Sequence, residues 1–393
     1  MKLITDRIGR VFKSKNFKRF APLVVIIIIL LVSLVTCTRR QEPAQPSPEP
    51  PVVSISPPSP TPSMTELAAE PAPIPESAPA PEPVYSGPVN PLTGLPSVND
   101  MANRRPLAIM INDHRVAQPQ LGVSQADIIY ETLVEGGITR MLALFMDVSN
   151  VGEIGSIRSS RLYYVDIAQS YDAVFIFAGG SPQAYTALSD RNITRLDGVN
   201  GKLTDIFYRD KQRLLTMSSE HTMVTTGALI TKYLPTYNFR LEHNSGYKTV
   251  LSFKEDGTPA DGKPALDFAV KFSSSKNTTF SYIADDKLYY LGQFGSSYRD
   301  GNNNAQLAFT NVLILKTSVS GIAGDTAGRL NIRTTGNGSG YFVCGGKYIE
   351  INWSRADNSS QFKYTLKDGS DLVLGRGKTY ICIIPSDVDV NIA

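Results

Sequence analysis

The chain has 393 residues, of which 42% are hydrophobic and 19% charged, and its formal net charge is +3. That charge is uneven, because residues 1–40 carry nine Lys and Arg against the single Asp6, which leaves the rest of the chain at −5. A mildly acidic body lacks the basic excess on which nucleic-acid binding depends, so we predict no nucleic-acid partner. The scattered histidines and cysteines have no metal-ligand spacing, so we also predict no metal and no cofactor.

The first 40 residues have the pattern of an export signal or membrane anchor. Basic residues precede the apolar block 21–35, and Cys37 follows it. Because positive charge stays on the cytoplasmic side, we expect the folded part to be anchored to the cell membrane on its extracytoplasmic face. Two forms of attachment stay open. Leu34-Val35-Thr36-Cys37 resembles a lipobox with a lipidated cysteine, although Thr36 is unusual there, and the long basic segment favours an uncleaved membrane helix.

Residues 41–88 have the composition of a linker. Sixteen of the 26 prolines and six glutamates fall between 42 and 88, without any Lys or Arg. Such a segment buries too little apolar area to offset its ordering entropy, so we predict disorder with an extended polyproline II bias. At roughly 3.1 Å per residue it holds the folded part about 100 Å from the bilayer, either to reach through a cell wall or as a passive spacer.

Residues 89–393 are too many for a single hydrophobic core, so we predict two domains, 89–241 and 242–393. In the first, apolar strands alternate with helices, which is typical of an α/β layer structure. The expected strands are 107–111, 128–132, 141–146 and 173–177, and the expected helices are 159–170 and one from Pro182 to about Leu188.

The second domain is predicted to be mostly antiparallel β, so the fold class is α+β with an α/β N-terminal domain. Asp-Gly, Asn-Gly and Gly-Gly turns separate its short strands. Cys344 and Cys382 both fall in predicted strands, where they either form a disulfide or serve as two small buried hydrophobes. The expected strands include 266–272, 279–283, 288–291, 312–315, 329–334, 348–353 and 379–384.

The segment 155–161 carries the most suggestive binding chemistry. Arg158 and Arg161 stand three apart at the predicted start of a helix, where unpaired N–H groups already attract anions. We therefore predict an anionic ligand there, unless Glu131, Glu135 or Glu153 supplies the partner carboxylates. The predicted ligand-binding residues of this cluster are Arg140, Ser156, Arg158, Ser159 and Arg161.

Gly179-Gly180-Ser181, between a predicted strand and helix, is a second candidate cradle for the anion. Ser181 is placed to cap the helix, and the glycines allow close backbone approach. A tight strand-to-helix turn without a ligand uses the same residues.

The sequence also contains catalytic candidates. Glu131 and Glu135, four apart on an extended segment, face the same side and can divide acid and base roles. They can equally form a structural network with Arg140 or line a cleft. Ser219-Glu220-His221 makes His221 a candidate helper, and Ser181 lies outside the Gly-x-Ser-x-Gly pattern of an α/β-hydrolase nucleophile.

Several motifs together resemble the YerB-like bacterial lipoproteins, which have paired N- and C-terminal domains of unknown function. The resemblance implies a membrane-attached, extracytoplasmic protein of Gram-positive type with an α/β and a β-rich domain, and no settled activity. The sequence departs from the family pattern at two places: Ser219-Glu220-His221-Thr222 stands where the family has a pattern nearer Pro-His-Asn, and Leu291-Gly292 replaces an expected arginine after Tyr290. The matching motifs are Asn90-Pro91-Leu92-Thr93-Gly94, Arg105-Pro106-Leu107-Ala108, Met110-Ile111-Asn112-Asp113, the segments 125–131, 135–140, 155–161 and 178–181, Phe309-Thr310-Asn311-Val312, Ile351-Asn352-Trp353, Lys367-Asp368-Gly369 and the closing 377–381.

Three functions follow as hypotheses. The first is a non-catalytic cell-envelope module that binds an anionic wall component or an envelope protein. The second is a wall-acting hydrolase or transferase that uses Glu131 or Glu135 with His221, which requires these residues around one open cleft with a carboxylate free of arginine. The third is a scaffold whose β-rich domain docks a membrane complex through an exposed apolar patch or strand edge.

Overall fold

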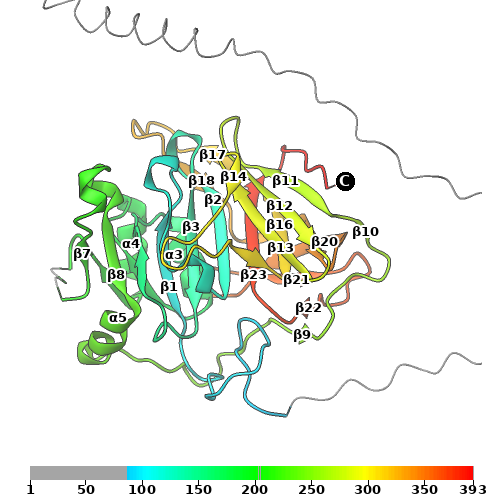
Figure 1. Ribbon diagram of the computed structural model, residues 1–393, viewed down its shortest axis with the longest axis horizontal. Coiled ribbons are helices and arrows are strands. Elements are labelled where there is room, and N and C mark those ends of the chain that lie inside the picture. Colours follow the sequence, from blue (N-terminus) through cyan, green and yellow to red (C-terminus); the bar gives the residue numbers. More distant parts are fainter. Residues whose placement is uncertain (1–85, 202, 204, 393) are drawn as a thin grey trace, which may run out of the picture. The chain divides into compact units, whose positions relative to one another are not determined.

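A mixed sheet of eleven strands runs through the part of the chain that the structure describes (Figure 1). The structure is a computed structural model, and it describes residues 86–392 apart from 202 and 204. The predicted anchor at 1–40, with Cys37, lies outside the described residues, as does the predicted linker at 41–88 up to residue 85. Within the described range, no helix combines the length and the apolar character needed to cross a membrane.

The large sheet joins strands from the two halves of the chain. Its order is β10-β20-β19-β16-β23-β2-β3-β1-β5-β6, and β21 pairs with β20. β23, red in Figure 1, runs parallel to β2 on one side and to β16 on the other. The strands are β1 (Leu107–Asn112), β2 (Ile128–Leu133), β3 (Thr139–Phe145), β5 (Val174–Phe177), β6 (Arg195–Asp197), β10 (Lys263–Pro264), β16 (Asn311–Thr317), β19 (Gly336–Cys344), β20 (Lys347–Arg355), β21 (Lys363–Thr365) and β23 (Thr379–Pro385).

The smaller sheets and the helices surround this one. The smaller strands are β4 (Glu153–Gly155), β7 (Tyr208–Arg209), β8 (Met223–Thr226), β9 (Phe253–Lys254), β11 (Asp267–Lys271), β12 (Asn277–Ile283), β13 (Leu288–Gln293), β14 (Ser296–Ser297), β15 (Ala308–Phe309), β17 (Val319–Gly321), β18 (Leu330–Ile332) and β22 (Leu374–Gly375). The described α-helices are α3 (Leu162–Ser170), α4 (Pro182–Asp190) and α5 (Gly227–Tyr233), and the 3-10 turns are η1 (Arg115–Ala117), η2 (Val123–Gln125), η3 (Glu135–Gly137), η4 (Arg213–Leu215), η5 (Ser219–His221) and η6 (Leu234–Tyr237).

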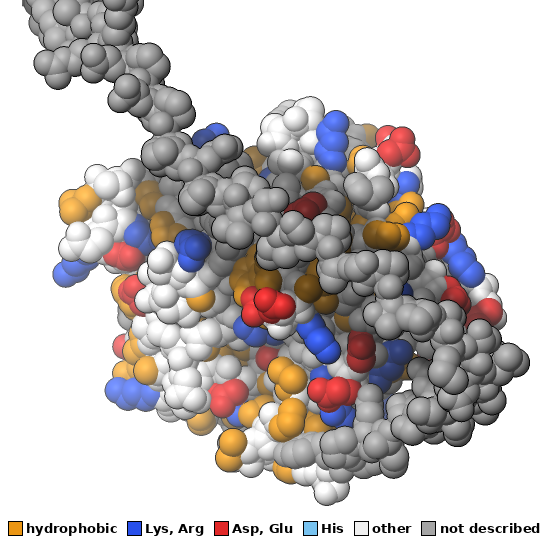
Figure 2. Space-filling view, turned by 45° about the vertical axis from the view of Figure 1, so that its right-hand side comes forward, with side chains coloured by type: hydrophobic (Ala, Val, Ile, Leu, Met, Phe, Trp, Pro, Cys, Tyr) orange, Lys and Arg blue, Asp and Glu red, His pale blue; other side chains and the backbone are white. Residues whose placement is uncertain are grey.

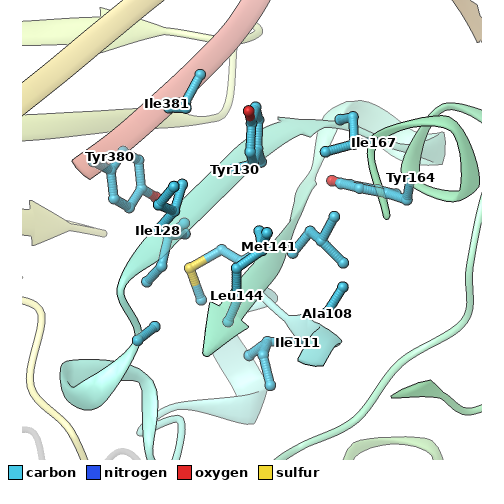
Figure 3. Packing of buried hydrophobic residues seen from close by; sticks show 14 of the residues in the cluster. Ala108, Ile111, Ile128, Tyr130, Met141, Leu144, Tyr164, Ile167, Tyr380 and Ile381 are labelled. Carbon is cyan, nitrogen blue, oxygen red and sulfur yellow. The ribbon is translucent and has the colours of Figure 1, made fainter. Parts of the chain in front are cut away.

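The central strands form because their apolar runs are buried on both faces. Every residue of β1, β2 and β3 is buried, which fits near-continuous apolar sequences such as LAIMIN better than an alternating pattern. Figure 3 shows the packing, with Tyr130 of β2 facing Ile167 and Tyr164 of α3. The Tyr130 hydroxyl also lies 2.8 Å from that of Tyr171.

The second sheet, β11-β12-β13-β14 with β15 on β13, is amphipathic. Burial alternates along β11 and β12, as expected for an antiparallel sheet with one wet face. Its buried face lies against the large sheet, where the Phe280 and Tyr380 rings meet edge to face at 5.5 Å. Figure 2 shows acidic, basic and hydrophobic side chains interspersed on the coloured part of that view.

More of the described residues lie in strands than in helices, so the α/β fold predicted for the N-terminal half is supported only in part. β1 pairs in parallel with β5, and β5 with β6, but β1, β3 and β2 are antiparallel neighbours. The helices are short, at nine residues in α3 and α4 and seven in α5. The reversal at η3 makes β2 and β3 a hairpin, and β1 pairs with the other edge of β3, so the middle of this half is antiparallel.

Cys344 and Cys382 are buried free thiols, so the possible disulfide between them is not present. β16 runs between their strands, with Asn311 opposite Cys344 and Ile314 opposite Cys382. Strands lie about 4.8 Å apart, and two such spacings exceed the Cα separation of roughly 4.4–6.8 Å that a disulfide requires. The alternative interpretation, two small buried side chains in a β core, describes them correctly.

Candidate functional site

Three arginines converge near one end of β1 and β3. Arg140 is the second residue of β3 and lies opposite Asn112 of β1 and Thr132 of β2. Arg158 follows β4 in an extended segment, where its N–H donates to the Met110 carbonyl at 3.0 Å. Arg161 is the N-cap residue of α3.

The predicted helix start at residue 159 is wrong by three residues, since α3 begins at Leu162. Ser160 forms a parallel β-bridge with Gly180. The Ser160 N–H donates to the Gly179 carbonyl at 2.9 Å, and the Ser181 N–H donates to the Ser160 carbonyl at 3.2 Å. This pairing keeps the chain extended up to Arg161. Arg158 and Arg161 therefore do not share a helix face.

The arginines differ in how their charge is balanced. Glu135 binds Arg161 through both carboxylate oxygens, with Oε1 at 2.5 Å from Nε and Oε2 at 2.7 Å from Nη2. Glu220, a largely exposed side chain, lies 3.5 Å from Nη2 of Arg158. One of the proposed carboxylate partners is therefore present, together with one that was not foreseen. Glu153 instead accepts from the Tyr208 hydroxyl at 2.7 Å.

Arg140 has no carboxylate within ion-pair distance among the described residues, although it is only 5% exposed. Its Nη1 donates to the Ser159 carbonyl at 2.5 Å. Burial, followed by the charges of Arg161 and Arg158, lowers the pKa of Arg140 to about 10. Three guanidinium groups against two carboxylates leave an excess of one positive charge in this cluster.

His221 and Asn112 lie beside Arg158 and its partner. The Asn112 Oδ1 accepts from the His114 N–H at 3.1 Å, which orients the amide so that Nδ2 faces Nδ1 of His221 at 2.8 Å. His221 Nδ1 therefore accepts, and its Nε2 points toward Glu220 Oε1 at 3.6 Å. Burial and the charge of Arg158 lower the pKa of His221, so it presents a neutral Nε2–H.

The predicted serine ligands serve the scaffold. Ser156 is fully buried, and its N–H donates to Gln120 Oε1 at 2.6 Å while its hydroxyl lies 3.2 Å from Asn112 Nδ2. Ser159 contributes through its carbonyl, which holds the Arg140 guanidinium in place.

The Gly179-Gly180-Ser181 turn holds a carboxylate of the protein itself. Asp197 Oδ1 accepts from the Gly179 N–H at 3.0 Å, and its Oδ2 accepts from the Tyr185 hydroxyl at 2.7 Å. Ser181 caps α4 by accepting from the Ala184 N–H at 3.2 Å, which confirms the predicted cap. The turn therefore serves strand-to-helix geometry, and Asp197 takes the place expected for an anion.

Glu131 and Glu135 are not brought together. β2 ends at Leu133, and Glu135 lies beyond it in η3, where it binds Arg161. Glu131 is fully buried on the other face of the sheet, beside Asp113 and Lys276, whose amine lies 3.2 Å from Glu131 Oε1. His221 belongs to the arginine side through Asn112.

Alternation along the strands explains this division. Adjacent strand residues point to opposite faces, so Asn112 and Arg140 share one face while Asp113 and Thr139 share the other. Asp113 and Lys276 were not predicted as site residues. Asp113, the polar residue that follows an apolar strand, carried a usable signal, whereas the exposed-looking Lys276 carried none.

A sizeable hollow among the described residues lies elsewhere, in the C-terminal half. It has a volume of about 690 Å³ and contains none of the predicted site residues. Its apolar wall includes Phe342, Tyr348 and Leu366.

Comparisons with known proteins cover most of the described residues. Residues 92–240 match the N-terminal domain, and residues 268–381 the C-terminal domain, of a family described as "Protein of unknown function (DUF3048)". The chain is 29% identical over 303 residues to "Putative lipoprotein YerB" of Bacillus subtilis (strain 168), covering 76% of this chain and 86% of that protein. The crystal structure of the YerB protein from Bacillus subtilis superimposes with a TM-score of 0.66 at 27% identity, covering 76% of this chain and 96% of that one.

Proposed function

The chain belongs to the YerB-like family with paired DUF3048 domains, and from this premise we propose that it is a membrane-anchored, extracytoplasmic module that binds an anionic group at Arg140, Arg158 and Arg161. The relative's description as a lipoprotein supports the anchoring, as do the apolar block 21–35 and Cys37. Orientation outside the cytoplasm follows from the basic residues that precede the block.

The observation that carries the proposal is the unbalanced charge of Arg140. A buried ion without a counter-ion costs several kcal/mol, and proteins ordinarily pair such a group. The described carboxylates nearby are already committed to Arg161 and Arg158. An anion that entered beside the exposed Glu220 would form charge-assisted hydrogen bonds with Arg140 and Arg158.

The geometry favours a planar or tetrahedral oxyanion. Guanidinium groups present fixed forks of N–H donors that match carboxylate and phosphate oxygens. The neutral His221 adds a further donor at Nε2 on the same side. A wall-polymer phosphate, a peptide carboxylate and an acidic patch of an envelope protein all carry this chemistry.

The catalytic alternative has less support. It requires a carboxylate free of cationic partners in an open cleft shared with His221. Glu135 is bound bidentately by Arg161, and Glu131 is fully buried beside Lys276. The neutral His221 suits a hydrogen-bond donor to an anion as well as it suits proton transfer.

Isothermal titration calorimetry of the full chain in mild detergent tests the proposal, with inorganic phosphate, acetate, teichoic-type polyphosphate and muropeptides as probes. We expect heat of binding from at least one probe, and its loss in Arg140→Met. The matched control is Arg376→Met, which removes an arginine that pairs with Glu255 in the C-terminal half. Equal binding by wild type, Arg140→Met and Arg376→Met would place the anion elsewhere and reject the site.

A further inference from the structure

A second charged cluster lies on the opposite face of the sheet and is independent of the proposed anion site. Lys276, in the turn between β11 and β12, directs its amine at two carboxylates. Nζ lies 2.7 Å from Asp113 Oδ2 and 3.2 Å from Glu131 Oε1. The side chain of Lys276 is 3% exposed, and those of Asp113 and Glu131 are 0% exposed.

Neighbouring groups fix this arrangement. The Thr139 hydroxyl bridges the two acids, at 2.8 Å from Asp113 Oδ2 and 2.7 Å from Glu131 Oε1. Tyr298 donates to Asp113 Oδ1 at 3.2 Å, and Tyr380 donates to Glu131 Oε2 at 2.6 Å. The Lys276 amine also lies 4.5 Å from the centre of the Phe294 ring.

The two acids have different protonation tendencies. Burial raises the pKa of Asp113 to about 7, whereas Lys276 and the hydroxyl donors hold the pKa of Glu131 below its ordinary value against the effect of burial. Asp113 is therefore the acid that takes a proton, and Glu131 remains the carboxylate. A protonated carboxylic acid is an acyl acceptor, and a carboxylate is a base.

We propose that Lys276 and Asp113 condense into an intramolecular amide bond that ties β1 to the β11–β12 hairpin, with Glu131 as the base. The buried contact between the Lys276 amine and the Asp113 carboxyl group supplies both reacting groups, and Glu131 contacts the amine directly and Asp113 through the Thr139 hydroxyl. The long residence of the groups in one geometry replaces an encounter between separate molecules.

The step balances without a co-reactant. Glu131 takes one proton from the Lys276 ammonium, and the neutral Nζ attacks Cγ of the protonated Asp113. The Nζ–Cγ bond forms, a second nitrogen proton passes to Oδ2 through Glu131 and the Thr139 hydroxyl, and the Cγ–Oδ2 bond breaks. The products are one amide, one water and a protonated Glu131, and no group is oxidised or reduced.

The surroundings suit this reaction. Negative charge develops on Oδ1 of Asp113 in the tetrahedral intermediate, where the Tyr298 hydroxyl already donates. Thr139 touches both the base and the departing oxygen, so a proton needs no water to move between them. The bond would join residues 163 positions apart and would link the two family domains covalently.

Peptide mapping of the full chain tests the proposal, because the amide bond can be detected in the wild-type protein without any substitution. The detergent-extracted protein is denatured, reduced, digested with trypsin and analysed by mass spectrometry. We expect a branched peptide of residues 105–115 joined to 272–287, at the sum of their masses less one water, with no cleavage after Lys276. Lys276→Arg and Glu131→Gln should both remove it, and Lys271→Arg, an exposed lysine on the same hairpin, should keep it.

Linear peptides that end at Lys276 in the wild-type digest would overturn the proposal. So would a joined mass of the two peptides, less one water, that persists in Lys276→Arg, because a side chain other than Lys276 would then form the link. A branched peptide of normal yield in Glu131→Gln would reject Glu131 as the base.

Discussion

Replacing Arg140 by methionine separates the cost of its unbalanced charge from the benefit of an anion. Methionine fills much of the arginine stem and removes the guanidinium. The pKa of Arg140, lowered from its ordinary value to about 10, corresponds to roughly 3 kcal/mol against the charged form in the fold. The lost hydrogen bond from Nη1 to the Ser159 carbonyl offsets about 2 kcal/mol of that.

In buffer without a bound anion, Arg140→Met should therefore be as stable as the wild type or more stable by about 1 kcal/mol. A phosphate-type anion at 100 times its dissociation constant should stabilise the wild type by about 2.7 kcal/mol and leave the variant unchanged. The order of stability should invert as the anion is added. Arg376→Met, by contrast, should follow the wild type at every anion concentration.

Urea unfolding of the full chain, followed by fluorescence, measures both quantities. Trp353 is the single tryptophan and is buried against Phe362, so its emission reports loss of the core. A loss of several kcal/mol in Arg140→Met without anion, together with equal stabilisation of both proteins by the anion, would refute the reasoning. Arg140 would then be a structural residue whose charge the fold already balances.

Three further predictions address other parts of the structure. Burial raises the pKa of Asp127 to about 6, so the folded state binds a proton at Asp127 more tightly than the unfolded state does. Protonated Asp127 should therefore stabilise the fold by about 3 kcal/mol at low pH, and this contribution should be lost as the pH rises through 6. Asp127→Asn should flatten this part of the curve of unfolding free energy against pH, and an unchanged curve would contradict the assignment. Glu135→Gln should destabilise the fold by about 1–2 kcal/mol, because Arg161 loses its carboxylate partner. The same substitution should strengthen phosphate binding in calorimetry, because the net positive charge of the three-arginine cluster increases. Weaker phosphate binding would count against an electrostatic site. Cys344 and Cys382 should resist maleimide until the protein unfolds, as mass spectrometry of peptides can establish, whereas a disulfide-linked peptide containing both would contradict the free thiols.

The sequence predicts the central strands well because their apolar runs are flanked by clear polar breaks. The expected strands at 107–111, 128–132 and 379–384 differ from β1, β2 and β23 by one residue at one end. The opening of β19 was missed, since its glycines have the composition of a turn. They serve close packing instead: a Cβ at Gly340 would lie 2.3 Å from the Ile314 carbonyl oxygen, and one at Gly338 would lie 2.5 Å from Nε1 of Trp353.

For the candidate site as well, local sequence predicts some features and contacts between distant segments decide the others. Local sequence identified the arginines, because Arg158 and Arg161 stand in one short segment. It did not indicate which arginine lacks a partner, since Glu220 reaches Arg158 from a distant turn. Lys276 could not be predicted for a different reason: its two carboxylates, Asp113 just after β1 and Glu131 in β2, lie more than a hundred residues earlier, and only the packing of the two halves brings them together.

The opposite faces of β3 determine how the two proposals can be tested apart. Thr139 touches the buried acids, and its neighbour Arg140 points to the arginine side. β2 serves both clusters, since Glu131 contacts Lys276 and the following η3 carries Glu135 to Arg161. A substitution in β2 would therefore disturb both, and a loss of function there would not say which cluster mattered. Arg140→Met and Lys276→Arg each change one face only, so anion binding should survive the second and the branched peptide should survive the first.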